Sequence, residues 1–324
     1  MLIVRYNCYA VLYVINSLSD FNMFVNNSSF FIIVIKGVVL CEYMIKGVIS
    51  VVTALLHGQG TWNLPLLGIL LFMLILFYRF NSRKTLPLYR GTNKKKRLYR
   101  LQLLLFVGGT VLLYMMIGSP FVPFSYLSFS FHMIHMSILF FIIPPMMLLG
   151  IPYELYITIQ RVPVIQVIAK MITPLRALIA FSILFLLYHI PMFLMILSEY
   201  AYGQRLFIIV LFVLSFRMWW PIASPNRHKR LDHQQMKQYA LISGLFIMPA
   251  CLFFIASGWF GRVPNPFFSQ LTTHLCIPSN GYIPPLLPPP FNTKYDQIMA
   301  GVFMLGLHKV ALAVTYRLGI KSLS

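Results

Sequence analysis

Histidines and methionines in apolar surroundings are the residues of this chain with the clearest chemical potential. They are densest in the segment Ser130-Phe131-His132-Met133-Ile134-His135-Met136. On a helix, residues three and four apart share a face, so His132 can lie beside His135 or Met136. Imidazole and thioether form a soft ligand set that suits Cu(I), whereas zinc or magnesium sites favour carboxylates or thiolates. The same side chains could instead fill space and hydrogen-bond to neighbouring helices, and this segment alone does not decide.

A second segment, Tyr188-His189-Ile190-Pro191-Met192-Phe193-Leu194-Met195, has a similar composition. His189 and Met192 are three residues apart and would share a helix face. Pro191 lacks a backbone N–H, so we expect a kink here and a free carbonyl near His189. One histidine with two methionines is more often core packing, so a metal site here requires ligands from the first segment.

Asp296 is the one acidic residue in or beside the last apolar segment of the chain. It could orient an imidazole as a carboxylate behind a metal ligand. It could equally act as a helix N-cap or first-turn acid, which Asp favours. His308 and Lys309 follow in the same segment, and we expect both to extend towards the cytoplasm.

The composition identifies an integral membrane protein. Of 324 residues, 59% are hydrophobic and 10% are charged, with only six acidic residues, and the mean hydropathy is +0.79. Soluble proteins carry about 25% charged residues, so this chain lacks the side chains needed to coat a water-facing surface. A soluble dehydrogenase, a nuclease and a disulfide-rich secreted domain are excluded. The sequence contains no nucleophile motif and no clustered carboxylate pair, so we expect no enzymatic activity.

The chain is predicted to be an all-α membrane protein, a seven-transmembrane-helix bundle with room for one extra N-terminal hydrophobic helix. A helix needs about 20 mainly apolar residues to cross a bilayer. The apolar segments are apolar on every face, whereas the strands of a membrane barrel would alternate. We expect the spans near residues 65–80, 98–118, 129–150, 176–198, 204–221, 239–258 and 295–317.

Lys and Arg residues alternate between the two sides of these spans. The first connection carries the run Lys94-Lys95-Lys96-Arg97, and the third and fifth connections and the C-terminal end are also basic. The opposite side carries Arg205, Arg262 and Lys294. By the positive-inside rule, the core begins outside the cell membrane and ends in the cytoplasm. The net charge of +20 is then a topology signal, with anionic membrane lipid as a contact. We expect no nucleic-acid partner.

We expect the chain to divide into an N-terminal hydrophobic extension, residues 1–60, and a membrane domain, residues 61–324. Charged residues such as Lys36 interrupt the apolar stretch of the extension, and a charge at a helix centre costs about 2.5–3.5 kcal/mol on insertion. Either the extension adds one span, or synthesis starts at Met44 and Lys46 precedes a signal anchor. Both interpretations remain open.

The expected topology places polar groups of three spans at a similar depth. His132 should lie within a turn or two of the outer surface, at 1.5 Å per residue. His189 should lie near the midplane with Met192 above it, and Asp296 opens the last span. A shared outer-leaflet site is therefore predicted, although topology alone does not show that these faces converge.

Several motifs resemble the CtaG family, polytopic cytochrome c oxidase assembly factors of Gram-positive bacteria. The stretch from Phe129-Ser130-Phe131-His132-Met133 to Pro144-Pro145 and Gly150-Ile151-Pro152 is the most specific of them. Shorter matches are Gly118-Ser119-Pro120, Leu187-Tyr188-His189-Ile190-Pro191, and Asp296-Gln297 with Gly301. The similarity covers roughly residues 60–320, and the name is shared with an unrelated single-span copper chaperone that this chain does not resemble.

The resemblance implies a role in forming an active haem-copper cytochrome c oxidase in the bacterial cell membrane, with oxidase subunits as partners. Copper delivery is the usual suggestion, and the matching positions are His132, Met136, His189 and Asp296. His135 stands where the family pattern also carries Gln. The alternatives are a copper permease, in which His308 would form a second station, and a membrane haem-binding protein with axial histidines from two helices.

Overall fold

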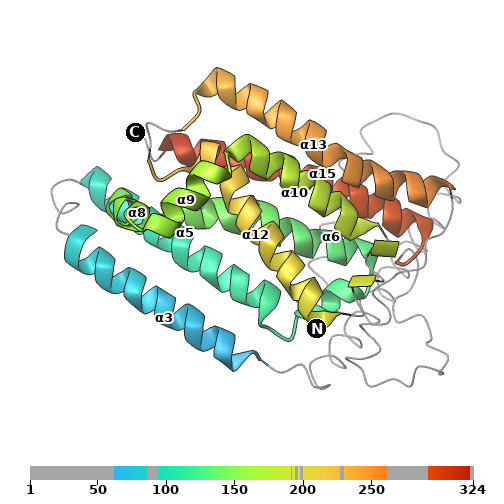
Figure 1. The fold of residues 1–324 in the computed structure, drawn as a ribbon, viewed down its shortest axis with the longest axis horizontal. Helices are drawn as coiled ribbons and strands as arrows, with labels where there is room; N and C mark the ends of the chain where they lie inside the picture. The colour runs from blue at the N-terminus through green and yellow to red at the C-terminus, as the bar shows by residue number, and fades with distance from the viewer. Residues whose placement is uncertain are drawn as a thin grey trace, which may run out of the picture.

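The regular structure is helical throughout the part of the chain that the computed structural model describes, which is residues 62–85, 93–190, 192–193, 196–197, 200–226, 230–260 and 291–321. The helices run roughly along one axis, and α8 and α9 lie at one end (Figure 1). The predictions for residues 1–60, Met44 included, fall outside the described residues. In order, the helices are α3 (Leu64–Phe80), η1 (Asn81–Thr85), α5 (Asn93–Ile117), η2 (Val122–Tyr126), α6 (Phe129–Ser137), η3 (Ile138–Ile142), α7 (Ile143–Gly150), α8 (Tyr153–Gln160), α9 (Pro163–Met171), α10 (Pro174–His189), α12 (Ala201–Ala223), α13 (His233–Phe260) and α15 (Lys294–Lys321).

Six helices of the described chain are long and apolar enough to cross a membrane, and six of the seven predicted spans are found among them. The exception is the span predicted over residues 176–198. There α10 ends at His189, and only a pair of helices bent by 77°, Ile165–Met171 and Pro174–His189, would supply a seventh crossing. Ile190 is extended, as expected of a residue that precedes proline. The predicted kink near Pro191 is thus a helix end.

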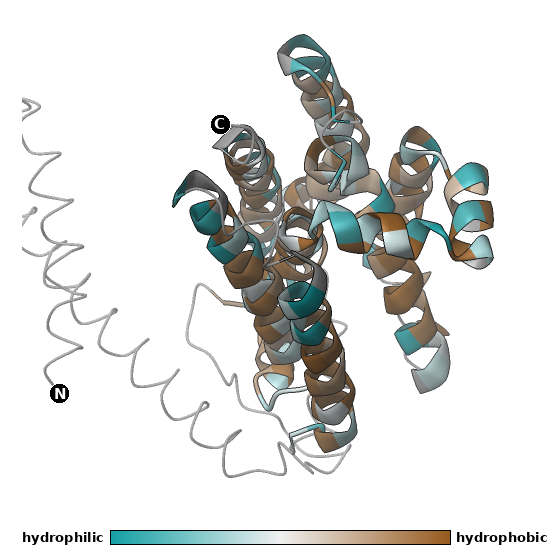
Figure 2. Ribbon diagram, turned by 90° about the vertical axis from the view of Figure 1, so that its left-hand side faces the viewer, coloured by the Kyte–Doolittle hydropathy of each residue, from teal (hydrophilic) through white to brown (hydrophobic). Residues whose placement is uncertain are grey.

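The surface of these helices is suited to lipid. Large apolar side chains such as Leu64, Leu104 and Leu241 are more than two-thirds exposed, although contiguous apolar surface is rare on soluble proteins. Hydrophobic residues cover the length of the helices and hydrophilic ones gather towards their ends (Figure 2). The helices are thus those of a multi-pass membrane protein.

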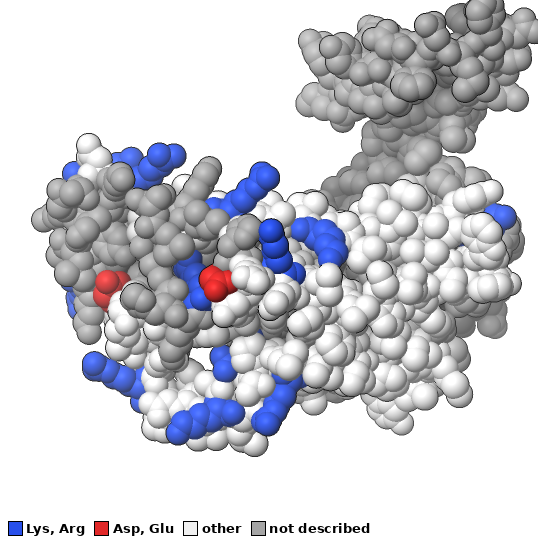
Figure 3. All heavy atoms as spheres, turned by 90° about the horizontal axis from the view of Figure 1, so that it is seen from above, with Lys and Arg blue, Asp and Glu red and all other residues white. Residues whose placement is uncertain are grey.

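Basic side chains gather at one end of the bundle. Lys and Arg are concentrated over the end that carries α8 and α9, whereas the other end is almost free of them on the face shown (Figure 3). The N-terminal ends of α6 and α15 lie at the Lys/Arg-poor end (Figure 1). This asymmetry agrees with the predicted alternation, and the orientation relative to the cell remains a prediction.

The third span is continuous but changes its helical winding in the middle. Pro144 has no N–H to donate to the carbonyl of Phe140, four residues earlier. The chain adopts a π turn at η3, closed by the bond from Ile143 N–H to the Ile138 carbonyl. The freed Phe140 carbonyl instead accepts a hydrogen bond from Trp219 Nε1 at 3.0 Å. The proline thereby ties this span to α12.

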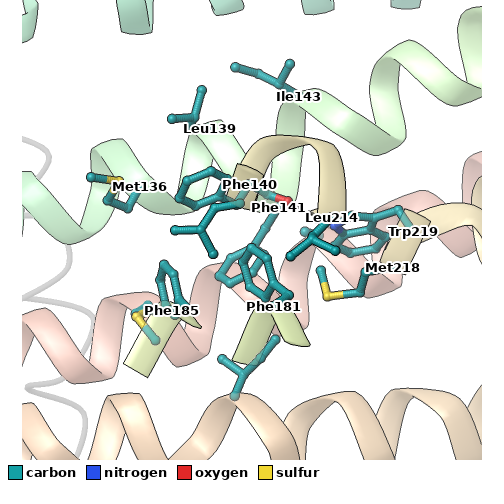
Figure 4. Close-up of a cluster of buried hydrophobic side chains, with 14 of the residues drawn as sticks. Met136, Leu139, Phe140, Phe141, Ile143, Phe181, Phe185, Leu214, Met218 and Trp219 are labelled. Carbon is teal, nitrogen blue, oxygen red and sulfur yellow. Dashed lines mark hydrogen bonds between the residues drawn. The ribbon is translucent and has the colours of Figure 1, made fainter. Parts of the chain in front are cut away.

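The hydrophobic core lies around this π turn. Figure 4 shows Met136, Leu139, Phe140, Phe141 and Ile143 beside Phe181 and Phe185 of α10 and Leu214, Met218 and Trp219 of α12, and all belong to one buried cluster. Glycine permits the close approach of α5 and α7, because a Cβ on Gly150 would lie 2.6 Å from the backbone nitrogen of Phe106. The core therefore holds α6, α7 and α10 in a defined arrangement.

Candidate functional site

Two buried histidines from different helices meet at the Lys/Arg-poor end of the bundle. His132 lies in the first turn of α6 and is 0% exposed, and His189 is the last residue of α10 and is 4% exposed. Their ring centroids are 5.9 Å apart, with an angle of 65° between the ring planes. The structure therefore brings together the two histidines that the sequence predicted to share a site. We refer to them as the histidine pair.

A hydrogen bond orients the ring of His189. Its Nδ1 lies 2.6 Å from the carbonyl oxygen of Phe185, one helical turn earlier. A carbonyl can only accept, so Nδ1 carries the proton and the lone pair of the neutral ring lies on Nε2. Nε2 is buried and makes no hydrogen bond to the described residues. Metal-binding histidines are commonly held in this way, with the other ring nitrogen bonded to a backbone carbonyl.

Aromatic side chains surround the histidine pair. The His189 ring lies 4.4 Å from the Phe185 ring and 5.4 Å from the Phe254 ring of α13, measured between centroids. Tyr188 stacks against His132 with centroids 6.1 Å apart and is 1% exposed. These rings make the surroundings of the pair apolar and keep bulk water away. Such surroundings favour a soft, weakly hydrated ion over a hard one.

His135 lies on the same helix as His132 but is turned towards α5. Its Nε2 donates a hydrogen bond of 2.7 Å to the carbonyl of Met116, at the end of α5. Residues three apart differ by about 60° around a helix axis, which accounts for the two directions. His135 thus makes a hydrogen bond to a neighbouring helix, which is the structural role that the sequence offered as the alternative to metal binding.

The two predicted methionines lie in different surroundings. Met136 is 2% exposed and belongs to the buried cluster one turn below His132 (Figure 4). Met192 is 74% exposed and lies beyond the end of α10. The expectation that His189 and Met192 share a helix face is wrong, because the helix ends before Met192 is reached.

Asp296 fastens the beginning of α15 to the beginning of α6. Its carboxylate accepts hydrogen bonds from the backbone N–H groups of Phe129 at 3.0 Å, Ser130 at 3.2 Å and Asn292 at 2.9 Å. Ser128, the N-cap of α6, accepts a further bond from a backbone N–H. A carboxylate at a helix N-terminus is stabilised by the unpaired N–H groups and the helix dipole. Asp296 is thus an acid in the first turn of its own helix α15, as one alternative predicted, and its carboxylate also caps α6, which carries His132.

Asn292 completes this connection. Its side-chain amide donates a hydrogen bond of 2.7 Å to the carbonyl of Leu127, just before α6. Its φ of 56° lies in the left-handed region, which Asn tolerates better than most residues. Asn292 and Asp296 together hold the segment that leads into His132.

His308 does not extend towards the cytoplasm as predicted. It is 1% exposed, and its ring lies 5.0 Å from that of Phe141 and 6.2 Å from that of Trp219. Helix α15 packs along α13 and also contacts α7 and η3, so this face of α15 points into the core. Its neighbour Lys309 is exposed instead.

Within the described ranges, no cluster of three or more His, Cys, Asp or Glu residues could hold a metal ion. A metal at this site would have to rest on the histidine pair with a thioether or another weak ligand. Sequence reasoning did not anticipate Tyr188, Phe254 or Asn292 here. Of these, only Tyr188 could have been suspected from the sequence, because it is the polar residue next to His189. Phe254 and Asn292 are brought to the site by the packing of distant segments.

Comparison with known proteins supplies the family. The family model described as "Cytochrome c oxidase caa3 assembly factor (Caa3_CtaG)" matches residues 84–318. The chain belongs to this family. No curated protein and no solved structure matches it. The histidine pair and the residues that fasten α6 to α15 lie inside the matched region, so the site is part of the shared family domain. The resemblance expected from the sequence is confirmed.

Proposed function

We propose that this protein supports formation of an active haem-copper oxidase by holding Cu(I) between His132 and His189 for transfer to an oxidase subunit. The family is one of cytochrome c oxidase assembly factors, which favours a role without turnover of its own. Copper would be cargo rather than a resident cofactor. The observation that carries the proposal is the arrangement of the histidine pair, with the Nε2 lone pair of His189 directed into a buried site.

The distance between the rings fits one shared ion. With metal–nitrogen bonds of about 2.0 Å, two imidazoles on one metal ion have ring centroids about 6 Å apart when they approach from opposite sides. The observed separation is 5.9 Å. Imidazole suits several transition metals, whereas a thioether such as that of Met136, one turn from His132, favours Cu(I), and the apolar surroundings disfavour ions that keep water.

A weakly held ion is what a delivery step requires. Two histidines, with Met136 one turn away, form a smaller ligand set than the clusters of three or more that hold a metal firmly. The ion could therefore pass to a stronger site on a partner. The hydrogen bond from His189 to Phe185 and the connection from Asp296 to α6 hold the two rings in place during loading.

Cu(I) binding by the purified protein tests the proposal directly. We expect the His132→Ala, His189→Ala double variant to lose Cu(I) binding in competition with a chromogenic Cu(I) chelator. His308→Ala is the matched control, because His308 is equally buried but lies outside the pair, and it should bind Cu(I) as the wild type does. Equal binding by the double variant and the wild type would contradict the proposed site.

Oxidase activity in membranes of a deletion strain, grown with and without added copper, tests the cellular role. We expect activity to be lost, to stay lost with copper, and to return with the His308→Ala gene but not with the double variant. Restoration by copper alone would instead favour a permease. Unchanged activity in the deletion strain would contradict a role in oxidase assembly.

The packing below the pair gives no support to the permease alternative. The rings of Phe185 and Phe141 follow one another between His189 and His308, with centroid distances of 4.4, 6.1 and 5.0 Å along the series. These apolar rings separate the two histidine positions.

The packing also disfavours the alternative of a haem-binding protein. A haem between the two histidines would have to displace Tyr188, Phe185 and Phe254, whereas a single ion would not. An absorbance spectrum of the purified protein without a Soret band would argue against haem binding and support the single-ion site.

A further inference from the structure

An open groove on the surface of α13 and α15 combines apolar walls with two amino groups. It has a volume of about 630 Å³ and no acidic residue among its lining residues. The lining residues are Lys237, Ala240, Leu241, Gly244, Leu245, Met248, Leu305 and Lys309. We propose that this groove binds an anionic phospholipid of the Lys/Arg-rich side of the membrane, with its phosphate on Lys237 and Lys309 and an acyl chain along the leucines. The inference is independent of copper binding.

The position of Lys309 is the first observation behind this proposal. Lys309 precedes Gly319, the end of the apolar span of α15, by ten residues, or about 15 Å. A lysine this far inside a span is costly unless its ammonium reaches a polar partner. Lys309 extends towards α13, where its Nζ lies 3.5 Å from the carbonyl oxygen of Ala240.

The ammonium of Lys309 retains capacity for an anion. An ammonium has three donors, and the described residues provide one acceptor, at the outer limit of hydrogen-bond distance. Gly244 makes room for the side chain, because a Cβ there would lie 2.5 Å from Lys309 Nζ. The glycine and the lysine together shape a charged end of the groove.

The depths of the charged and apolar parts of the groove match those of a phospholipid headgroup and its acyl chain. Lys237 lies about 6 Å and Ala240 about 10 Å from the start of α13 at His233. The charged end is therefore near the membrane boundary on the Lys/Arg-rich side, where basic sites between transmembrane helices bind anionic headgroups. Leu241, Leu245 and Met248 lie deeper, where an acyl chain would run.

The charge pattern of the groove favours an anionic lipid over an apolar helix of a partner protein. From Lys237 to Met248 the groove runs along α13 for roughly 16 Å. Its two lysines are its only charged lining residues, and the other lining residues are apolar or small. An anionic headgroup followed by an acyl chain matches this combination of charged and apolar side chains.

Native mass spectrometry of the purified full chain, with phosphatidylglycerol or phosphatidylcholine of the same acyl chains, tests the proposal. We expect phosphatidylglycerol to bind more tightly, and the affinity of the Lys237→Gln, Lys309→Gln variant for it to fall by about 25-fold, at roughly fivefold per lysine. Lys294→Gln, at the other end of α15, is the control and should keep the affinity. Equal binding of the two lipids, or equal binding by the double variant and wild type, would overturn the proposal.

Filling the groove provides a second test that does not remove charge. Gly244→Leu should block phosphatidylglycerol binding, whereas Gly306→Leu should not, because a Cβ on Gly306 meets nothing within 4 Å. Thermal unfolding in detergent shows whether both variants fold. Unchanged lipid binding by a folded Gly244→Leu variant, with loss of an oxidase subunit from its complexes, would assign the groove to a partner helix and refute the lipid.

Discussion

Replacement of Asp296 by Asn tests how the start of α6, and hence His132, is held. Asp296 is 3% exposed and accepts three backbone N–H groups at 2.9–3.2 Å. Asn has the same shape but keeps a single acceptor oxygen. If that oxygen takes the place that serves Phe129 and Asn292, the N–H of Ser130 faces the amide group and loses its acceptor.

The magnitude follows from these contacts. A buried N–H left without an acceptor costs about 1–3 kcal/mol. Loss of the negative charge at the N-terminus of α6 costs about 0.3–1 kcal/mol, and up to about 2 kcal/mol in buried surroundings. We therefore expect Asp296→Asn to lower the free energy of unfolding by about 2–4 kcal/mol, and to weaken Cu(I) binding because the start of α6 loosens.

Unfolding in mixed detergent micelles, followed by circular dichroism, measures the first effect, and chelator competition measures the second. Asp232→Asn is the matched control. Asp232 is exposed and accepts one bond, from the N–H of Gln235 at 2.8 Å, before α13. Asn is as good as Asp at such an N-cap, so its effect should be a few tenths of a kcal/mol. If Asp296→Asn destabilised the protein no more than Asp232→Asn, the proposed fastening of α6 would be refuted.

Further substitutions test other parts of the structure, those of Trp219 and the glycines by unfolding in the same micelles and that of His135 by chelator competition for Cu(I). Trp219→Phe should cost about 1–3 kcal/mol, because it leaves the buried carbonyl of Phe140 without its donor; an unchanged stability would contradict the account of the π turn. Gly150→Ala should cost about 1–3 kcal/mol through collision with the α5 backbone, whereas Gly306→Ala should gain up to about 1 kcal/mol, and equal effects would argue against close packing. His135→Gln keeps a donor for the α5 carbonyl and should leave Cu(I) affinity unchanged, so a fall in affinity would make His135 a ligand.

The apolar spans and the charged end of the bundle were predictable because both depend on local composition. Apolar length determines which segments can cross a bilayer, and six of the seven predicted spans are found with small differences at their ends. The span predicted over residues 176–198 is not found as one continuous helix, because mean hydropathy does not reveal that α10 ends at His189, before Pro191. The segregation of Lys and Arg along the chain likewise predicted their gathering at one end.

Only the tertiary structure decided which polar groups meet. The spans are apolar on every face, so no amphipathic stripe in the sequence shows which side of a helix points inwards. The histidine pair results from the rotations of α6 and α10 about their own axes, and the same rotation directs His135 to α5. Asp296 shows the same limit: its sequence context suggested a cap or an imidazole partner, and packing made it the cap of another helix.

The sequence by itself therefore determined that this is a helical multi-pass membrane protein, which segments are long and apolar enough to span a bilayer, and which family the chain belongs to. The tertiary structure determined that His132 and His189 share one buried site, that Met192 stays outside it and that His308 is enclosed by aromatic rings. The physical reason is that hydropathy acts residue by residue along the chain. Ligand geometry instead depends on contacts between residues that are distant in the chain, and close packing of side chains sets those contacts.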